Sequence, residues 1–300
     1  MSQISDSMNS PPPHFIPDLR QGLTDLYDGI SKWSKSQCVD PAPDSIATKE
    51  RASFSRPDFL VSASAIVTLL LESSGEHVSA FVKTITEPVE PIACWTCVRS
   101  MLETSSLAAW LHDPTIDART RVGRAFSLRF EGMEQQEKFA ALLGQSELDA
   151  VRNSTARLVA DADSLGYPIF VNPKNQRTAL GQRQPNATTI IATVLDEEKK
   201  YRLLSAVAHG HFWAISQLSF RTVPNTSTQV NPGAVKVQAF EKAPSIMGIG
   251  FLGSAAFKAL ARPFWNHSHY FGWDSLRLEE LFESVADKVS LSIPLRFWRS

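Results

Sequence analysis

Cysteine is scarce in this 300-residue chain, which contains three, and an odd number cannot be fully paired into intramolecular disulfides. The opening segment MSQISDSMNSPPPHF lacks the basic and apolar regions that a secretory leader requires. Disulfide-stabilised secreted domains, which need a dense and even set of cysteines, are therefore excluded. We expect a reduced, cytoplasmic protein.

An excess of charge is missing as well, with 30 basic against 31 acidic side chains and a formal net charge of −1. This balance excludes a uniformly basic coat for nonspecific nucleic-acid binding, so any such contact must be a local patch. Long apolar runs are also absent, because the best one, from Phe59 to Leu71, contains Ser62, Ser64 and Thr68. A membrane span needs roughly 18 or more apolar residues, and we expect no membrane association.

Motifs of the common nucleotide-dependent and hydrolytic enzymes do not occur. The chain has no Gly-x-x-x-x-Gly-Lys-Ser/Thr loop, no Gly-x-Gly-x-x-Gly loop after a strand, and no Gly-x-Ser-x-Gly elbow. The CWTC pair, Cys94 and Cys97, lies in a segment with helical spacing rather than in a thioredoxin-like setting. We interpret these two cysteines as packing residues.

Histidine occurs in two His-x-His pairs, His209 with His211 and His267 with His269. Residues two apart on a helix point about 200° away from each other, so neither pair converges unless its backbone is extended. Glu-x-x-His and His-Glu-x-x-His patterns are missing too. We therefore predict no metal site and no cofactor.

Helical periodicity dominates the rest of the chain. Residues 1–56 are rich in Ser, Pro and Asp, and we expect a flexible segment there, with one short helix, that the fold does not require. Residues 57–300 are predicted to form an all-α bundle of about six to eight helices. The NPG turn at 231–233 and the alternating pattern that follows it indicate at most one small β-hairpin.

The segment 91–113 alternates large apolar residues with small ones and is predicted to be the central helix. Arg99 and Glu103 lie four residues apart on it, His112 stands at its end, and Arg119 follows on the next helix. Such charges among apolar neighbours are tolerated only when paired. This set is either a largely buried network that joins helices or part of a ligand pocket, and we favour the network.

The most informative stretch is YRLLSAVAHG, residues 201–210. Seven positions on an α-helix turn about 700°, so Arg202 and His209 face nearly the same way, with Ser205 between them. In phosphodiester cleavage an imidazole handles the proton of the attacking hydroxyl, while a guanidinium holds the phosphoryl oxygens. Arg202 and His209 are the candidate catalytic residues, and the same pair can alternatively serve only to tie helices together.

YRLLSAVAHG, together with the block RSMLETSSLAAWLHDPTIDARTR, resembles bacterial helical proteins related to the HEPN group, over residues 57–220. Nuclease members of that group carry Arg, four to six residues, then His on one helix, which Arg202 and His209 match. The resemblance implies a metal-independent endoribonuclease of toxin or phage-defence systems, with an RNA substrate, a site built across a homodimer and an antitoxin partner. Residues 221–300 would be a C-terminal extension. Leu203 stands where active members usually carry a polar residue.

Two other functions fit the same residues. One is a noncatalytic helical binding module, in which the Arg, Glu and His side chains only stiffen the fold. The other is a small-molecule sensor with an aromatic pocket made by Trp95, Trp110, Phe212 and Trp213. A nuclease requires Arg202 and His209 exposed in a cleft, whereas a binding module buries both against neighbouring helices.

Overall fold

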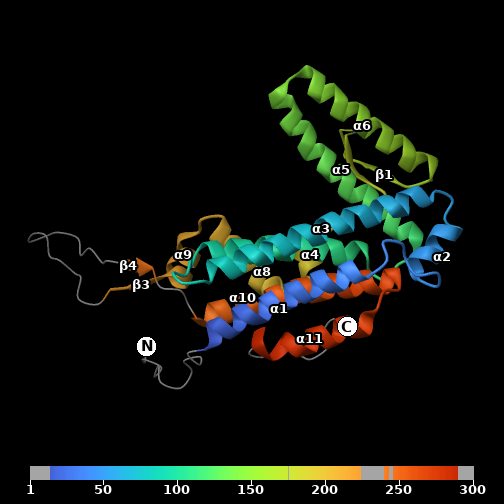
Figure 1. Cartoon of the computed structure of the whole chain (residues 1–300). Helices are drawn as coiled ribbons and strands as arrows, with labels where there is room; N and C mark the ends of the chain where they lie inside the picture. The colour runs from blue at the N-terminus through green and yellow to red at the C-terminus, as the bar shows by residue number, and fades with distance from the viewer. Residues whose placement is uncertain (1–13, 175, 224–239, 243–245, 290–300) are drawn as a thin grey trace, which may run out of the picture.

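The computed structural model describes residues 14–174, 176–223, 240–242 and 246–289, and within them the chain is mostly helical (Figure 1). This confirms the prediction that the chain is mainly α-helical. The predicted number of helices was wrong, because the described residues form eleven. The helices are α1 (Phe15–Ser36), α2 (Ile46–Ser53), α3 (Pro57–Thr84), α4 (Ala93–Leu111), α5 (Ala118–Leu143), α6 (Gln145–Ser164), α7 (Ala187–Leu195), α8 (Glu198–Ala208), α9 (Phe212–Ser219), α10 (Ile246–Phe271) and α11 (Ser275–Val289).

The additional helices have local causes. The segment 186–220 has helical periodicity throughout, but two residues with positive φ divide it into three helices. Asp196 has φ 54° and ends α7, and Gly210 has φ 74° and ends α8. A right-handed helix cannot continue through the left-handed region, so the chain changes direction at both positions. Helix α2 is capped at its start by Ser45, whose side chain accepts a hydrogen bond from the Thr48 amide.

The structure contains two small antiparallel sheets, whereas the sequence predicted at most one small β-hairpin. Strand β1 (Ile169–Val171) pairs with β2 (Arg177–Leu180). Strand β3 (Phe220–Thr222) pairs with β4 (Phe240–Lys242), with Arg221 opposite Glu241. The predicted NPG turn at 231–233 lies outside the described residues.

Helix α4 is the centre of the bundle, as its composition predicts. It packs against α3 and α10 on two sides and against α7 and α8 on others. Ser105 and Ala108 are fully buried, and the Ser105 hydroxyl lies 2.6 Å from that of Ser74 on α3. Small side chains at these positions allow the helix axes to approach closely. Helix α3 runs through Gly75, where the ring of Tyr27 packs so closely that an added Cβ would lie 2.8 Å from its Cε2 atom.

The N-terminal helix α1 belongs to the packed bundle, which differs from the flexible segment expected for residues 1–56. Its apolar side chains Leu19, Leu23 and Leu26 are fully buried, and the helix lies against α3, α10 and α11 (Figure 1). The Trp33 indole donates a hydrogen bond to the Asp274 carbonyl, 2.8 Å away, and so fixes the C-terminal end of α1. The Pro and Ser residues that suggested flexibility lie mainly outside this helix. The helix itself is amphipathic, and its apolar face therefore packs against the core.

Helix α3 is long and apolar enough to cross a membrane when judged by length and composition alone. Core helices of soluble proteins satisfy the same criterion. In this structure the side chains of Leu60, Ala63 and Val67 are fully buried within the protein.

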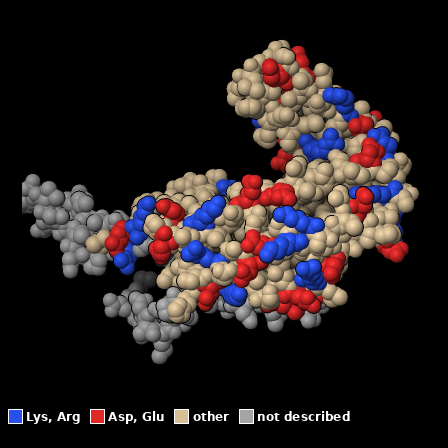
Figure 2. All heavy atoms as spheres, viewed as in Figure 1, with Lys and Arg blue, Asp and Glu red and all other residues tan. Residues whose placement is uncertain are grey.

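Helices α5 and α6 form an antiparallel hairpin that projects from the bundle (Figure 1). A second apolar cluster, which includes Phe126, Leu158 and Tyr167, fills the base of this arm. Its tip carries three exposed apolar side chains, Phe139, Leu142 and Leu143. Between the base of the arm and helices α3 and α4 lies a groove of about 910 Å³. Figure 2 shows Lys and Arg side chains interspersed with Asp and Glu over the bundle, in keeping with the balanced composition.

Candidate functional site

A pocket of about 280 Å³ lies at the junction of α8 and α9 and brings the candidate catalytic residues together. The predicted residues Arg202, Ser205 and His209 all line it, as the two-turn spacing on α8 requires. The other lining residues are Thr188, Tyr201, Ala206, His211 and Trp213. Both Arg202 and His209 are exposed, which is the arrangement that a catalytic pair needs.

A left-handed turn at Gly210 adds a second imidazole to this pocket. Helix α8 ends with the Gly210 amide donating to the Val207 carbonyl at 3.0 Å and the His211 amide donating to the Ala206 carbonyl at 2.9 Å. These two bonds form a Schellman motif, which reverses the chain beyond the helix. The rings of His209 and His211 consequently lie 6.5 Å apart, centroid to centroid. The helical angle of about 200° does not apply to this pair, because His211 has an extended backbone.

Arg202 is held at the rim of the pocket by a neighbour on the same helix. Its Nε lies 2.8 Å from Oε1 of Glu198, and the two side chains are 68% and 46% exposed. An exposed pair at this spacing contributes only about 0.3 to 0.5 kcal/mol. A bound anion can therefore replace the Glu198 carboxylate at small cost, which leaves Arg202 available to a ligand.

Arg99 and Glu103 support the pocket from α4 instead of lining it. The Tyr201 hydroxyl donates to Oε1 of Glu103 at 2.8 Å, and the Arg99 guanidinium lies 3.1 Å from the same carboxylate. The pair joins α4 to α8, but it is less buried than expected, with side chains 23% and 34% exposed. Burial and the hydrogen bond to Glu103 raise the pKa of Tyr201, so its phenol stays protonated and continues to donate. This contact, together with the apolar face of α8, holds the helix against α4.

His112 and Arg119, the other two predicted binding residues, lie elsewhere. Arg119 donates to the Gly166 carbonyl at 2.6 Å and stacks on the Tyr167 ring, which fixes the end of α6 against α5. His112 is fully buried at the end of α4, where its Nδ1 lies 2.8 Å from Nδ1 of His267. Neither residue lines the pocket at α8 and α9.

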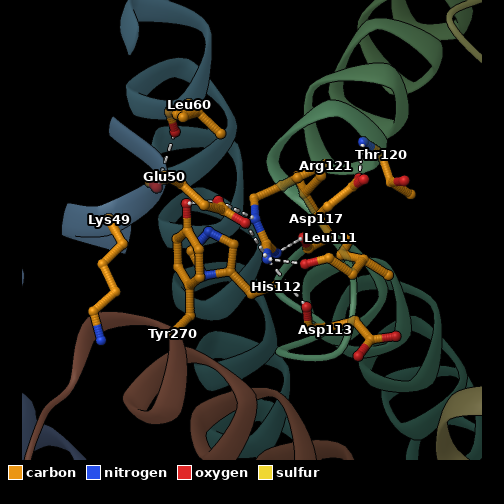
Figure 3. Close-up of polar contacts among 12 residues, drawn as sticks. Lys49, Glu50, Leu60, Leu111, His112, Asp113, Asp117, Thr120, Arg121 and Tyr270 are labelled. Carbon is orange, nitrogen blue, oxygen red and sulfur yellow. Dashed lines mark hydrogen bonds and ion pairs between the residues drawn. The ribbon is translucent and has the colours of Figure 1, made fainter. Parts of the chain in front are cut away.

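A buried polar network beside His112 was not predicted from the sequence. Arg121, which has no exposed surface, donates from Nε to Oε2 of Glu50 at 3.0 Å and from Nη1 to the Leu111 carbonyl at 2.7 Å (Figure 3). The Tyr270 hydroxyl donates to the same Glu50 oxygen at 2.8 Å, and the guanidinium lies over the Tyr270 ring. The network connects α2, α5 and α10 around the end of α4. Its members are far apart in the sequence, and no local spacing marks them as partners.

In the part of the chain that the structure describes, no three His, Cys, Asp or Glu side chains lie close enough together to hold a metal ion. Cys94 and Cys97 lie in the first two turns of α4 with free thiols. Burial raises the pKa of Cys94 to about 12 and raises that of Cys97 as well. Neither thiol is activated as a nucleophile, because only the thiolate reacts.

The four aromatic residues of the proposed sensor pocket are separated by burial. Trp95 and Trp110 are buried in α4, whereas Phe212 and Trp213 on α9 are 78% and 52% exposed. Trp213 lines the pocket with the two imidazoles, and Phe212 stands beside it in the sequence. Of these four rings, the two on α9 are the ones exposed to a ligand.

Comparison with models of protein families, with curated proteins and with solved structures finds no match to this chain. The comparisons give no support to a HEPN assignment. The described residues form a mostly helical protein with two small antiparallel sheets.

Proposed function

We propose that the pocket at α8 and α9 cleaves single-stranded RNA without a metal ion. The observation that carries this proposal is the convergence of one guanidinium, Arg202, and two imidazoles, His209 and His211, on a single exposed pocket. Transesterification of RNA requires one group to accept a proton, another to donate one, and a cation to stabilise the charge that develops on the phosphate. These three side chains are of the types that this reaction uses.

The reaction follows from these roles. One imidazole accepts the proton of the 2′-hydroxyl as its oxygen attacks the adjacent phosphorus. The second, protonated imidazole donates its proton to the departing 5′-oxygen, so that the products carry a 2′,3′-cyclic phosphate and a free 5′-hydroxyl. Arg202 leaves Glu198 and binds the non-bridging phosphoryl oxygens, a geometry suited to its planar fork.

Recognition of a single strand is supported by α9. The exposed rings of Phe212 and Trp213 offer faces on which unpaired bases can stack, a contact worth about 1 to 3 kcal/mol for each base. This local surface replaces the basic coat that the composition excludes. Under the HEPN-like interpretation a second copy of the chain would complete the site, and a protein antitoxin would cover it.

The test uses the full chain with an unstructured labelled RNA, the same sequence as DNA, and a 2′-O-methylated RNA, all in the presence of EDTA. We expect cleavage of the RNA alone, with cyclic phosphate ends. Arg202→Ala, His209→Ala and His211→Ala should each lower the rate by about 10²-fold or more, in line with the contribution of a positioned acid or base. Arg152→Ala is the matched control, since Arg152 also forms an exposed ion pair, with Glu137 at 2.8 Å.

All three variants should keep the melting temperature of the parent, because the altered side chains contribute little to packing. Absence of cleavage by the parent chain, or equal cleavage by the parent and all three variants, would exclude the proposal. A large loss of stability in Arg202→Ala and His209→Ala, without any cleavage by the parent, would instead favour the noncatalytic binding module.

A further inference from the structure

The groove of about 910 Å³ at the base of the arm shares no lining residue with the pocket at α8 and α9. Its apolar lining includes Ile66 and Leu70 on α3, Leu107 on α4 and Leu128 on α5, and each of these side chains is partly exposed. Less than half of the most apolar stretch of α3 is buried in this structure. The recess between the arm and the bundle, visible in Figure 2, therefore presents aliphatic surface from three helices at once.

The charges of this groove are mainly negative. Three carboxylates line it, those of Glu103, Glu131 and Glu134, against one cation, Arg183. Arg183 lies over the Phe170 ring, 5.1 Å from its centroid. Glu131 and Glu134 form no ion pair within the described part of the chain. A cation that enters the groove would be attracted by this excess of carboxylates.

The carboxylates on α5 lie close to one another. Burial raises the pKa of Glu134, and Glu131 and Glu137 add to this effect, whereas Lys138 opposes it. Like charges one turn apart on a helix repel each other. Binding of a cationic partner would relieve this repulsion.

Gly132 stands between these carboxylates, inside α5 and on the wall of the groove. A Cβ at this position would meet nothing within 4 Å, so no contact inside the described chain requires a glycine. Glycine is also less favourable than alanine in the interior of a helix. The missing side chain does, however, allow the backbone of a partner to approach α5 closely.

We propose that this groove is a docking site for a basic amphipathic α-helix of another protein. The aliphatic face of that helix packs on Ile66, Leu70 and Leu107. Lys or Arg side chains that flank this face pair with Glu131 and Glu134. An RNA strand is disfavoured on the same surface, because its phosphates would meet carboxylates.

The shape of the groove favours a helix over an extended peptide. Three of its walls are the helices α3, α4 and α5, and the side-chain ridges of such walls accept the ridges of a further helix. A helix with its side chains is about 10 Å across and rises about 5.4 Å per turn. The groove therefore has room for about two turns.

The test titrates the full chain into a fluorescently labelled peptide and follows the anisotropy of the label. The peptide has about four helical turns, with Leu at i, i+3, i+4 and i+7 and Lys at the other positions. We expect saturable binding with a Kd on the order of micromolar. A peptide with Glu in place of Lys and a basic peptide with a central Pro should each bind at least about tenfold more weakly, because one reverses the charge and the other breaks the helix.

Three variants of the protein locate the site. Gly132→Leu places a side chain in open space, so it should weaken binding by about tenfold or more while the melting temperature does not fall. Glu131→Lys should also weaken binding by about tenfold. Glu280→Lys is the matched control, because it makes the same change of charge at an exposed glutamate on α11 and should leave binding unchanged. Glu103 is kept in all variants, since it also holds Tyr201.

The proposal is overturned if the acidic or the Pro-containing peptide binds as tightly as the basic one, or if Glu280→Lys weakens binding as much as Glu131→Lys. A parent chain that sediments as a dimer, with Gly132→Leu as a monomer, would also overturn it, because the groove would then belong to a second copy. RNA cleavage enters none of these readouts, so they are independent of the proposed nuclease.

Discussion

The Nδ1 atoms of His112 and His267 lie 2.8 Å apart in rings whose planes differ by 6°, although 155 residues separate them in the sequence. This contact joins the end of α4 to α10 in the interior of the bundle. Both rings must be neutral there, since protonation would place a charge in a site with almost no access to water.

Acid should therefore destabilise the fold before its carboxylates protonate. In the unfolded chain an imidazole titrates near pH 6.5, whereas burial lowers the pKa of His267 to about 4. The unfolded state binds more protons between these values, so the free energy of unfolding falls as the pH decreases through this window. For His267 alone the loss approaches about 3 kcal/mol at pH 4.

Denaturant unfolding at several pH values, with His267→Gln for comparison, measures this effect. The variant lacks one of the two titrating rings and should show a shallower pH dependence over the same window. Parallel curves for the parent and the variant would show that the pair does not govern acid stability.

Glu50→Gln should destabilise the protein by about 3 to 5 kcal/mol, because it leaves the fully buried Arg121 guanidinium without its carboxylate. Glu137→Gln is the control, as it breaks the exposed pair with Arg152 and should cost less than about 1 kcal/mol. Equal losses in the two variants, measured by chemical denaturation, would contradict a role for burial.

Leu23→Ala tests whether α1 is part of the core. Leu23 is fully buried, and removing such a side chain typically costs about 2 to 5 kcal/mol. Leu276→Ala, at a position 71% exposed, should change the free energy of unfolding by no more than about 0.5 kcal/mol. Unchanged stability in Leu23→Ala would restore the view that residues 1–56 are dispensable.

Substitutions of Gly210 separate the turn from the side chains that it orients. Gly210 has φ 74°, and a Cβ placed there would meet nothing within 4 Å, so backbone strain alone decides the outcome. Asparagine tolerates this region, whereas a β-branched residue does not. Gly210→Val should destabilise the fold by about 1 to 2 kcal/mol and impair RNA cleavage, and Gly210→Asn should preserve both. Full cleavage by Gly210→Val would show that the turn does not position His211.

Local patterns predicted the features that depend on neighbouring residues. The spacing of Arg202, Ser205 and His209 places them along one face of α8, and the small residues of α4 indicate its central position. The boundary between α5 and α6 is likewise local, because Gly144, with φ 150°, stands between them.

Features that depend on tertiary packing were not predictable in this way. The partners of Arg121 are Glu50 and Tyr270, 71 and 149 residues away along the chain, and only the assembled bundle brings them together. His211 was not among the candidate residues, because the spacing alone does not show that its backbone is extended after the turn at Gly210. The apolar face of α1 was visible in the sequence, but the helices that bury it, α10 and α11, lie at the opposite end of the chain.

The arm formed by α5 and α6 starts at the buried network of Arg121, Glu50 and Tyr270, so a small rotation at this base is enlarged at the tip. Arg121 lies in the first turn of α5, and Leu143, the last residue of that helix, is about 33 Å further along at 1.5 Å per residue. A rotation of about 10° at this base moves the tip by about 6 Å, as the length of the helix dictates. The positions of Phe139, Leu142 and Leu143 therefore depend on a base that is held both by the apolar cluster around Phe126 and by the contacts of Glu50 and Tyr270 with the Arg121 guanidinium.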